Sequence, residues 1–209
     1  AFRQTSIFSM GVDFADLDRD GFDDIFVSDM LSRDHATRML ETGDIRPTLL
    51  PIGAIDDRPQ YSHNTLFRNR GDGTYAEIAQ FAGVQASEWT WSPNFVDVDL
   101  DGYEDLLITT GHELQMMNGD VINRAEALKA QKQMSAPEMQ RLRTLFPRNV
   151  IPNVAFRNRG DLTFEEVSHA WGFDHPDVCN GVALADLDND GDLDLVINNL
   201  NGPAEVYRN

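Results

Sequence analysis

The chain has 209 residues, of which 41% are hydrophobic, and a formal net charge of −18. This length supports one sizeable hydrophobic core, and we expect residues 1–209 to form part of one domain. The acidic excess argues against a nucleic acid or an anionic membrane as partner, because these partners bind basic surfaces. No apolar run approaches the roughly 18 residues of a transmembrane segment, and the single cysteine, Cys179, leaves no intramolecular disulfide to form.

An acidic pattern of nine residues, D-x-D-x-D-G-x-x-D, occurs three times, at residues 16–24, 97–105 and 186–194. Carboxylates at this density repel one another unless a cation lies among them. Ca²⁺ accepts about six to eight oxygen ligands in irregular geometry, and the glycine at position 6 permits the sharp turn. We therefore predict one structural Ca²⁺ in each loop, about three ions in all.

The predicted ligands are the carboxylates at positions 1, 3, 5 and 9 and the backbone carbonyl at position 7. The carboxylates are Asp16, Asp18, Asp20 and Asp24 in the first loop, Asp97, Asp99, Asp101 and Asp105 in the second, and Asp186, Asp188, Asp190 and Asp194 in the third. The position 7 residues are Phe22, Tyr103 and Asp192.

Two alternatives to this interpretation are an EF-hand and an acidic hairpin turn that binds no metal. An EF-hand requires flanking helices and an acid at position 12, where this chain has Val27, Ile108 and Ile197. The flanking runs are short and apolar, which favours β-strands on both sides of each loop. Acidic Asp-Gly turns without metal are common in hairpins, but the same register in three copies argues against that alternative.

A second motif accompanies the first, at residues 66–75, 155–164 and 206–209, and reads as a strand, a tight Gly-Asp turn and a further strand. The spacing from this motif to the next acidic loop is 30 residues in both complete cases, whereas the spacing from loop to motif varies. A bare repeat of about 51 residues with four short strands is typical of a β-propeller blade. The fold class predicted is therefore all-β, a partial propeller of about two and a half to three blades.

Two insertions interrupt the repeats, at about residues 31–62 and 112–152. The first is polar and rich in proline, so we expect an irregular loop with a helical turn at residues 35–40. The second is rich in helix formers at residues 121–131, and a capping box at Ser135 opens a second helix through Phe146. The second insertion is therefore predicted to be a helical hairpin.

The remaining candidate positions are aromatic or histidine residues. Trp89 and Trp91, two apart on a strand, share one face and are candidates for ligand binding or for packing between blades. His112 follows a predicted strand at the start of the helical insertion, where a functional site or an ordinary surface pair with Glu113 would both fit. His63, His169 and His175 have no partner that spacing assigns.

The two motifs together resemble the FG-GAP/VCBS repeats, whose blades carry a D-x-D-x-D-G-x-x-D loop followed by a Y/F-R-N-x-G-D-G-T-F strand pair. Within that group, residues 64–69, 86–93 and 180–185 resemble bacterial secreted proteins related to cartilage acidic protein, of the ASPIC/UnbV type. The resemblance implies an exported or cell-surface propeller. One departure is Leu162, which replaces the second glycine of the hairpin turn.

Three functions are consistent with these patterns. The first is a non-catalytic scaffold or protein-interaction subunit of a cell-surface or secreted assembly, the second a lyase-like carbohydrate-active propeller, and the third an adhesion module similar to the integrin head. The chain contains no recognisable nucleophile elbow, P-loop, H-E-x-x-H or Cys/His zinc spacing, which favours the first and assigns no catalytic residue.

The location and partners follow from calcium and from the blade count. Extracellular-type Ca²⁺ sites fill at millimolar Ca²⁺ and remain largely empty at cytosolic levels, so we expect an extracytoplasmic location, secreted, periplasmic or on the cell surface. The blades visible here are too few for a closed ring, and residues 206–209 end without a hairpin partner. Further blades of the same protein or a partner subunit are therefore expected, with a glycan or an envelope protein as further candidate partners.

Overall fold

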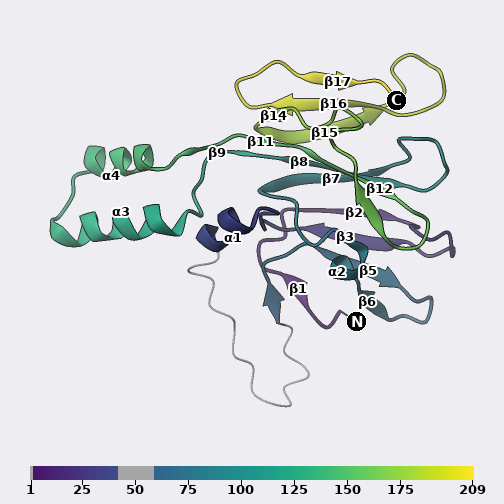
Figure 1. Cartoon of the computed structure of the whole chain (residues 1–209), viewed down its shortest axis with the longest axis horizontal. Coiled ribbons are helices and arrows are strands. Elements are labelled where there is room, and N and C mark those ends of the chain that lie inside the picture. The colour runs from purple at the N-terminus through teal and green to yellow at the C-terminus, as the bar shows by residue number, and fades with distance from the viewer. Residues whose placement is uncertain (1, 42–58) are drawn as a thin grey trace.

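The computed structural model describes residues 2–41 and 59–209, which form a mostly β molecule (Figure 1). Three antiparallel sheets make up its body. The first has the order β2-β3-β5-β6, with strands Gly11–Ala15, Asp24–Ser28, Thr65–Asn69 and Tyr75–Glu77. The second has the order β7-β8-β12-β13, with strands Thr90–Val96, Asp105–Thr110, Val154–Asn158 and Phe164–Glu166. The third has the order β15-β16-β17, with strands Cys179–Ala185, Asp194–Asn199 and Glu205–Tyr207.

The three acidic loops occupy the same place in the three sheets. Each connects the first two strands, and the last residue before the loop pairs with the aspartate at position 9: Ala15 with Asp24, Val96 with Asp105 and Ala185 with Asp194. The predicted β-strands on both sides of each loop are confirmed. Within the described residues no sheet closes on itself.

The second sheet is buried on both faces, because it lies between the other two (Figure 1). Leu106 and Ile108 of β8 belong to the apolar layer shared with the first sheet, together with Phe26. Leu107, between them, belongs to the layer shared with the third sheet, together with Ile197. Because side chains alternate along a strand, burial on both faces requires the uninterrupted apolar run that β8 carries.

In each of the first two sheets, one buried asparagine connects the sheet to the chain that leads into the next one. Asn64 Oδ1 accepts the Asp29 amide (2.7 Å), and its Nδ2 donates to the Val84 carbonyl (2.9 Å). Asn153 Oδ1 accepts the Thr110 amide (3.0 Å), and its Nδ2 donates to Cys179 Sγ (3.2 Å) at the start of the third sheet. Both residues are fully buried and directly precede the third strand of their sheet. Satisfied buried amides of this kind fix one strand arrangement, since an unpaired buried polar group is costly.

Short helices fill or extend the connections. Helix α2 (Ala79–Ala82) follows β6, and its two terminal alanines are buried in the layer between the first two sheets. In the first insertion, α1 spans His35–Glu41 as predicted, whereas the rest of that prediction lies mostly outside the described residues. No described helix is long and apolar enough to span a membrane.

The second insertion forms the predicted helical hairpin, with α3 at Gly119–Gln131 and α4 at Ala136–Leu142. The capping box of Ser135 and Glu138 is confirmed, but α4 ends at Leu142 and continues only as a 3₁₀ turn, Arg143–Leu145. The helix is therefore shorter than predicted. The hairpin projects from the end of the sheets opposite the acidic loops (Figure 1).

Three short strand pairs involve the insertions. Strand β1 (Thr5–Ser6) pairs in parallel with β4 (Gln60–Tyr61), and β9 (His112–Leu114) pairs antiparallel with β10 (Arg148–Asn149). Strand β11 (Ile151–Pro152) pairs antiparallel with β14 (Pro176–Asp177). The last pair connects the second insertion to the segment that enters the third sheet.

Candidate metal centres

The three acidic loops share one backbone conformation. Position 4 is left-handed in each, with φ of 59° at Arg19, 56° at Leu100 and 62° at Asn189. The glycine at position 6 follows with φ between 90° and 103°. Only glycine adopts this second value without strain, which is why position 6 is invariant among the three loops. The three loops therefore make the same turn at positions 4 and 6.

The aspartate at position 1 holds the turn together from inside. Asp16 accepts the amides of Asp20 (3.0 Å) and Gly21 (2.9 Å), and Asp186 accepts those of Asp190 and Gly191 (both 3.2 Å). Asp97 accepts the Gly102 amide through Oδ2 (2.8 Å). Each of these carboxylates therefore faces the centre of its own loop.

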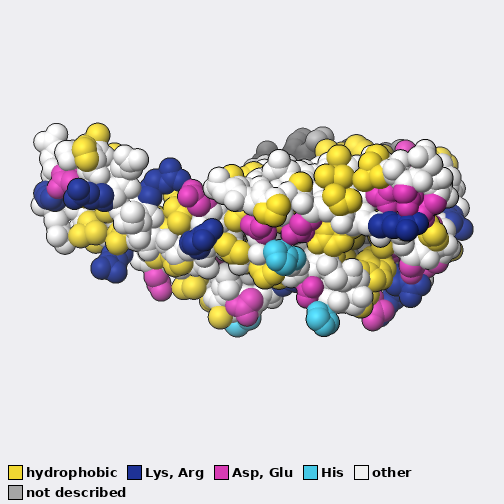
Figure 2. All heavy atoms as spheres, turned by 90° about the horizontal axis from the view of Figure 1, so that it is seen from above, with side chains coloured by type: hydrophobic (Ala, Val, Ile, Leu, Met, Phe, Trp, Pro, Cys, Tyr) yellow, Lys and Arg dark blue, Asp and Glu magenta, His cyan; other side chains and the backbone are white. Residues whose placement is uncertain are grey.

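An arginine in the third strand, or directly after it in the third sheet, spans the acids at positions 3 and 5 in every loop. Arg68 contacts Asp18 at 2.7 Å and Asp20 at 3.6 Å. Arg157 contacts Asp99 at 2.6 Å and Asp101 at 3.2 Å, and Arg208 contacts Asp188 and Asp190 at 2.8 and 2.9 Å. Figure 2 shows basic side chains among acidic ones at this end of the molecule. One guanidinium offsets only part of the charge of at least four carboxylates.

Local sequence spacing does not mark these three arginines as part of the loops. Arg68, Arg157 and Arg208 stand directly before the asparagine of the second motif in all three copies. Their recurrence beside an acidic repeat was the available signal. A basic residue that repeats with an acidic loop is a candidate counter-ion even when the spacing between the two varies.

The aspartate at position 9 ties each loop to the third strand. Asp105 accepts the Asn158 amide through Oδ1 (2.8 Å) and the Val98 amide through Oδ2 (2.9 Å). Asp194 accepts the amides of Asn209 (3.0 Å) and Leu187 (2.9 Å) in the same way. Burial raises the pKa of Asp105 to about 6 despite these bonds, and Asp24 shows the same shift for the same reason. This position therefore has a clear structural role of its own.

Position 7 packs on the hairpin turn of the second motif. The Phe22 ring lies against Gly71, where an added Cβ would be 2.7 Å from the ring, and Tyr103 lies against Gly160 in the same way (3.1 Å). Arg19 of the first loop also lies over the Tyr103 ring, 4.4 Å from its centroid, so the first two loops are in contact. Phe22 and Tyr103 therefore serve packing, which leaves their backbone carbonyls for the ligand role that the sequence predicts, whereas Asp192 Oδ1 in the third loop is buried without a hydrogen-bond partner among the described residues.

The carboxylate oxygens of each loop converge closely enough for one cation. Ligand atoms lie within 4.8 Å of one another in the sets Asp16, Asp18, Asp20; Asp97, Asp99, Asp101; and Asp186, Asp188, Asp194. Within the described part of the chain, Asp18 Oδ1 and Asp97 Oδ1 are buried without a hydrogen-bond partner. A buried carboxylate oxygen without a partner is costly unless a cation satisfies it. The residues therefore fit a hard, oxygen-liganded ion such as Ca²⁺.

The aromatic and histidine candidates lie at the opposite end and contact one another. The His112 ring stacks on Trp89 (centroids 4.3 Å apart, 25° between planes) and lies 6.3 Å from Trp91. Trp91 Nε1 donates to the Gly111 carbonyl (2.5 Å), and His112 Nδ1 lies 2.7 Å from the Leu114 carbonyl. Because His112 covers one face of Trp89, that face is not an open platform for a sugar ring.

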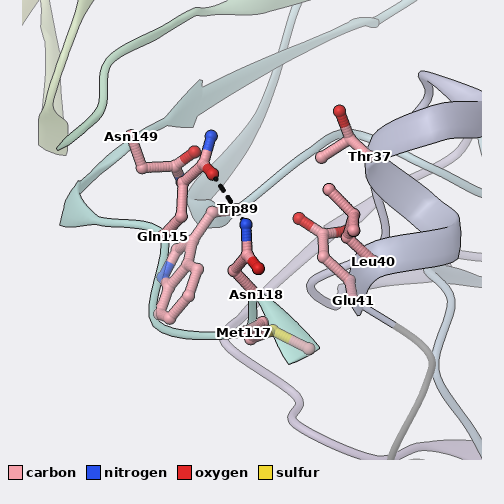
Figure 3. Close-up of a pocket in the computed structure, with 8 residues that line it drawn as sticks. All are labelled: Thr37, Leu40, Glu41, Trp89, Gln115, Met117, Asn118 and Asn149. Atoms are coloured by element: carbon pink, nitrogen blue, oxygen red, sulfur yellow. Dashed lines mark hydrogen bonds between the residues drawn. The ribbon is translucent and has the colours of Figure 1, made fainter. Parts of the chain in front are cut away.

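Trp89 also lines a small hollow between α1 and the second insertion (Figure 3). The hollow has room for about one water molecule. Its lining consists of Thr37, Leu40, Glu41, Trp89, Gln115, Met117, Asn118 and Asn149. Burial raises the pKa of Glu41 to about 7. Among the described residues, Trp89 Nε1 has no hydrogen-bond partner, so the hollow suits one small polar molecule and not an extended substrate.

The sequence profile of the FG-GAP-like repeat matches residues 52–108 and 150–197, and the chain belongs to this family. The chain is also similar to cartilage acidic protein 1, with 47% identity over 57 residues for the Homo sapiens protein. The identity is 44% over 59 residues for Xenopus tropicalis and 44% over 57 residues for Mus musculus. Each match covers 27% of this chain and 9% of the relative. The predicted family is confirmed, and it suggests an extracellular adhesion or interaction module.

Proposed function

We propose that this chain is the calcium-stabilised part of an extracytoplasmic β-propeller that serves as a non-catalytic scaffold or protein-interaction subunit. The observation that carries the proposal is the threefold recurrence of one loop geometry, with carboxylate oxygens gathered within 4.8 Å. All three loops lie at the same end of the stacked sheets (Figure 1). A repeated site of this kind, built into the first hairpin of each of the three larger sheets, supports a role in stabilising the fold.

The propeller part of the proposal rests on how the sheets stack. Adjacent sheets share apolar layers, and the segment after the fourth strand of one sheet packs against the next, as Phe173 does beside the third sheet. Within the described residues, β17 pairs with β16 alone, and Val206 in it is 65% exposed. An apolar hollow lined by residues including Trp171, Phe173 and Tyr207 lies beside this strand. An edge of this kind is suited to a further strand from the same protein or from a partner subunit.

The proposals of bound calcium and of an extracytoplasmic location depend on the negative charge of the loops. Each loop carries at least four carboxylates, and its arginine offsets one of them. A bound Ca²⁺ would offset two more charges and satisfy the buried oxygens of Asp18 and Asp97. Weak sites of the extracellular type fill only at the millimolar Ca²⁺ found outside the cytoplasm. This supports an extracytoplasmic location, and Ca²⁺ that binds only the folded loop would add directly to stability.

The interaction part rests on the helical hairpin. It projects from the sheets (Figures 1 and 2), and among its described residues only Ala125 of α3 and Leu142 of α4 are buried. Met139 is 53% exposed. A projecting element with little buried surface adds little to the core and is free to meet another macromolecule, such as an envelope protein. The lyase-like and integrin-like alternatives would use the same end of the molecule, and no described contact favours either.

The stability part is tested by Asp18→Asn, which removes one ligand charge and keeps the size of the side chain. Urea unfolding in millimolar Ca²⁺ should show a loss of at least about 1 kcal/mol. In EDTA the loss of stability should be much smaller. Without a cation the four acids repel one another, and the substitution removes one of these charges. Asp161→Asn is the matched control, since this exposed aspartate caps a hairpin turn through Thr163 alone and should act equally in both buffers. Equal effects of Asp18→Asn in both buffers would contradict the metal role.

The interaction part needs a separate experiment. Removing residues 119–145 and joining the ends with a short linker should leave the calcium-dependent melting transition in place, because the hairpin buries little. The same deletion should abolish capture of a partner from native envelope extracts. Turnover on a polysaccharide panel would instead support the carbohydrate-active alternative and contradict a non-catalytic role.

A further inference from the structure

A second type of metal-ligating cluster lies away from the acidic loops. Side chains of His175, Asp177 and Glu205 each offer a ligand atom within 4.8 Å of the others. His175 directly precedes β14, Asp177 lies in β14 and Glu205 begins β17. The face above the third sheet shows histidine and acidic side chains next to one another (Figure 2). The three residues therefore converge from two separate segments of the chain.

The charge around this cluster differs from that in the loops. Each acidic loop is contacted by an arginine from outside the loop. Among residues 2–41 and 59–209, in contrast, no lysine or arginine forms an ion pair with Asp177 or Glu205. The one basic partner is His175, whose Nδ1 lies 2.9 Å from Glu205 Oε1. Two carboxylates facing one imidazole leave an excess of negative charge that a divalent cation would balance.

Surrounding groups hold the two carboxylates in place. The Tyr207 hydroxyl donates to Glu205 Oε2 (2.8 Å), and the Val178 amide donates to Asp177 Oδ1 (2.7 Å). Supporting hydrogen bonds of this kind orient ligands in metal sites and strengthen them. Glu205 has only 21% of its side chain exposed, whereas His175 has 63% exposed and can adjust toward an ion.

We propose that His175, Asp177 and Glu205 form a site for a transition-metal dication of the zinc type, distinct from the acidic loops. An imidazole with two carboxylates suits Zn²⁺ and related ions, whereas Ca²⁺ prefers oxygen ligands alone. Ligands that each lie about 2.0–2.2 Å from one ion are roughly 3–4 Å apart, and small shifts of the exposed imidazole reach that geometry. A solvent molecule would complete the tetrahedral set.

The bound ion would cross-link the third sheet to the neighbouring pair of strands β11 and β14. Strand β17 is held in its sheet by β16 alone among the described strands, and β14 pairs with β11 of the second insertion. A metal bridging Glu205 to Asp177 would fasten the edge strand to the segment that enters the sheet. The site would therefore stabilise the third sheet and the attachment of the second insertion together.

The alternative is a simple ion pair between His175 and Glu205, and the chain contains a matched example. His169 Nδ1 lies 2.9 Å from Asp174 Oδ2, the same separation, and this pair is not part of any three-ligand group among the described residues. The two pairs differ in the third ligand, Asp177. His169→Gln is therefore the control for His175→Gln.

The test is calorimetric titration of the 209-residue chain with Zn²⁺ in a buffer that contains millimolar Ca²⁺, so that the acidic loops are occupied. The expected result is one Zn²⁺ per chain, with affinity reduced at least about tenfold by His175→Gln and by Asp177→Asn, and unchanged by His169→Gln. Co²⁺ should give a visible absorption band that His175→Gln abolishes. Zn²⁺ should also raise the melting temperature of the wild type but not of Glu205→Gln, which reports the cross-link.

Absence of Zn²⁺ binding to the wild-type chain would overturn the proposal, as would binding that His175→Gln leaves unchanged. Melting curves of each variant without Zn²⁺ establish that it is folded. Because Ca²⁺ is present throughout, failure of this site leaves the calcium-loop proposal standing. Failure of the calcium loops would likewise leave this one standing.

Discussion

The side-chain amide of Asn158 donates to the backbone carbonyl of Leu17, 3.1 Å away and 141 residues earlier in the chain. Asn158 ends the third strand of the second sheet, and Leu17 lies at position 2 of the first acidic loop. The next sheet repeats the arrangement, since Asn209 Nδ2 donates to the Asp97 carbonyl of the second loop (3.1 Å). The first and second loops are therefore each bonded to the sheet that follows them.

Replacing Asn158 by alanine should lower the free energy of unfolding by at least about 2 kcal/mol, because the buried Leu17 carbonyl and the partly buried Glu104 carbonyl lose their donor. Asn69→Ala is the matched control. Asn69 makes the corresponding bonds to Asp23 and Gly71 within its own sheet but no described bond to a neighbouring sheet. Urea unfolding of the control should show a smaller loss, about 1 kcal/mol. Equal losses would mean that the bond between the sheets contributes nothing.

Arg157→Gln should reveal how the arginine and the metal share the charge of the second loop. Without Ca²⁺ the guanidinium is the positive group that contacts Asp99 and Asp101, so its loss should lower the urea midpoint clearly in EDTA. Saturating Ca²⁺ should reduce this effect. The surface pair Arg159–Glu165 provides the control, because Arg159→Gln should respond equally with and without Ca²⁺. A larger effect in Ca²⁺ than in EDTA would show that the arginine helps to hold the ion.

Leu162 occupies a position where the second glycine of the turn stands in the first sheet, and it keeps the left-handed conformation, with φ of 67° against 81° at Gly73. Leu162→Gly should therefore stabilise the chain by up to about 1 kcal/mol. An added Cβ at Gly73 would meet no atom within 4 Å, so Gly73→Leu isolates the conformational cost and should destabilise by about 1 kcal/mol. Unfolding midpoints that move in the opposite directions would contradict this account.

Glu41 should make stability depend on pH near neutrality. Burial raises its pKa from 4.5 to about 7, and the nearby Glu88 adds to the shift. Between pH 4.5 and about pH 7 the folded chain holds a proton on Glu41 that the unfolded chain has lost. The free energy of unfolding should therefore fall as the pH rises through this range. Above this range Glu41→Gln should be more stable than wild type by about 1 kcal/mol. Glu126→Gln, on the exposed face of α3, should leave the pH profile unchanged.

The parts of the fold that could be predicted from the sequence are those that local patterns determine. The acidic loops, the strands that flank them and the capping box at Ser135 each depend on residues a few positions apart. The contacts that were missed join distant segments. Arg157 reaches Asp99 and Asn158 reaches Leu17 only because the third strand lies beside two loops, and no local spacing reports that neighbourhood.

The contacts of the histidines could not be predicted from the sequence for the same reason, because they join segments that are distant in the chain. His175 and Glu205 are 30 residues apart, and spacing alone assigned His175 no partner. The sequence pattern pairs Trp89 with Trp91 but not with His112, and the pairing of β7 with β8 brings all three into one stacked group. Pairing of strands in three dimensions is what places such side chains together.

The central claim is that the three repeated loops are calcium sites, and counting the bound ions tests it most directly. The chain should be stripped with a chelator and titrated with Ca²⁺ to millimolar concentration by calorimetry. Three ions per chain are expected, one for each of the loops at residues 16–24, 97–105 and 186–194. Fewer than two would contradict the account, because the loops share one backbone conformation and one set of carboxylates.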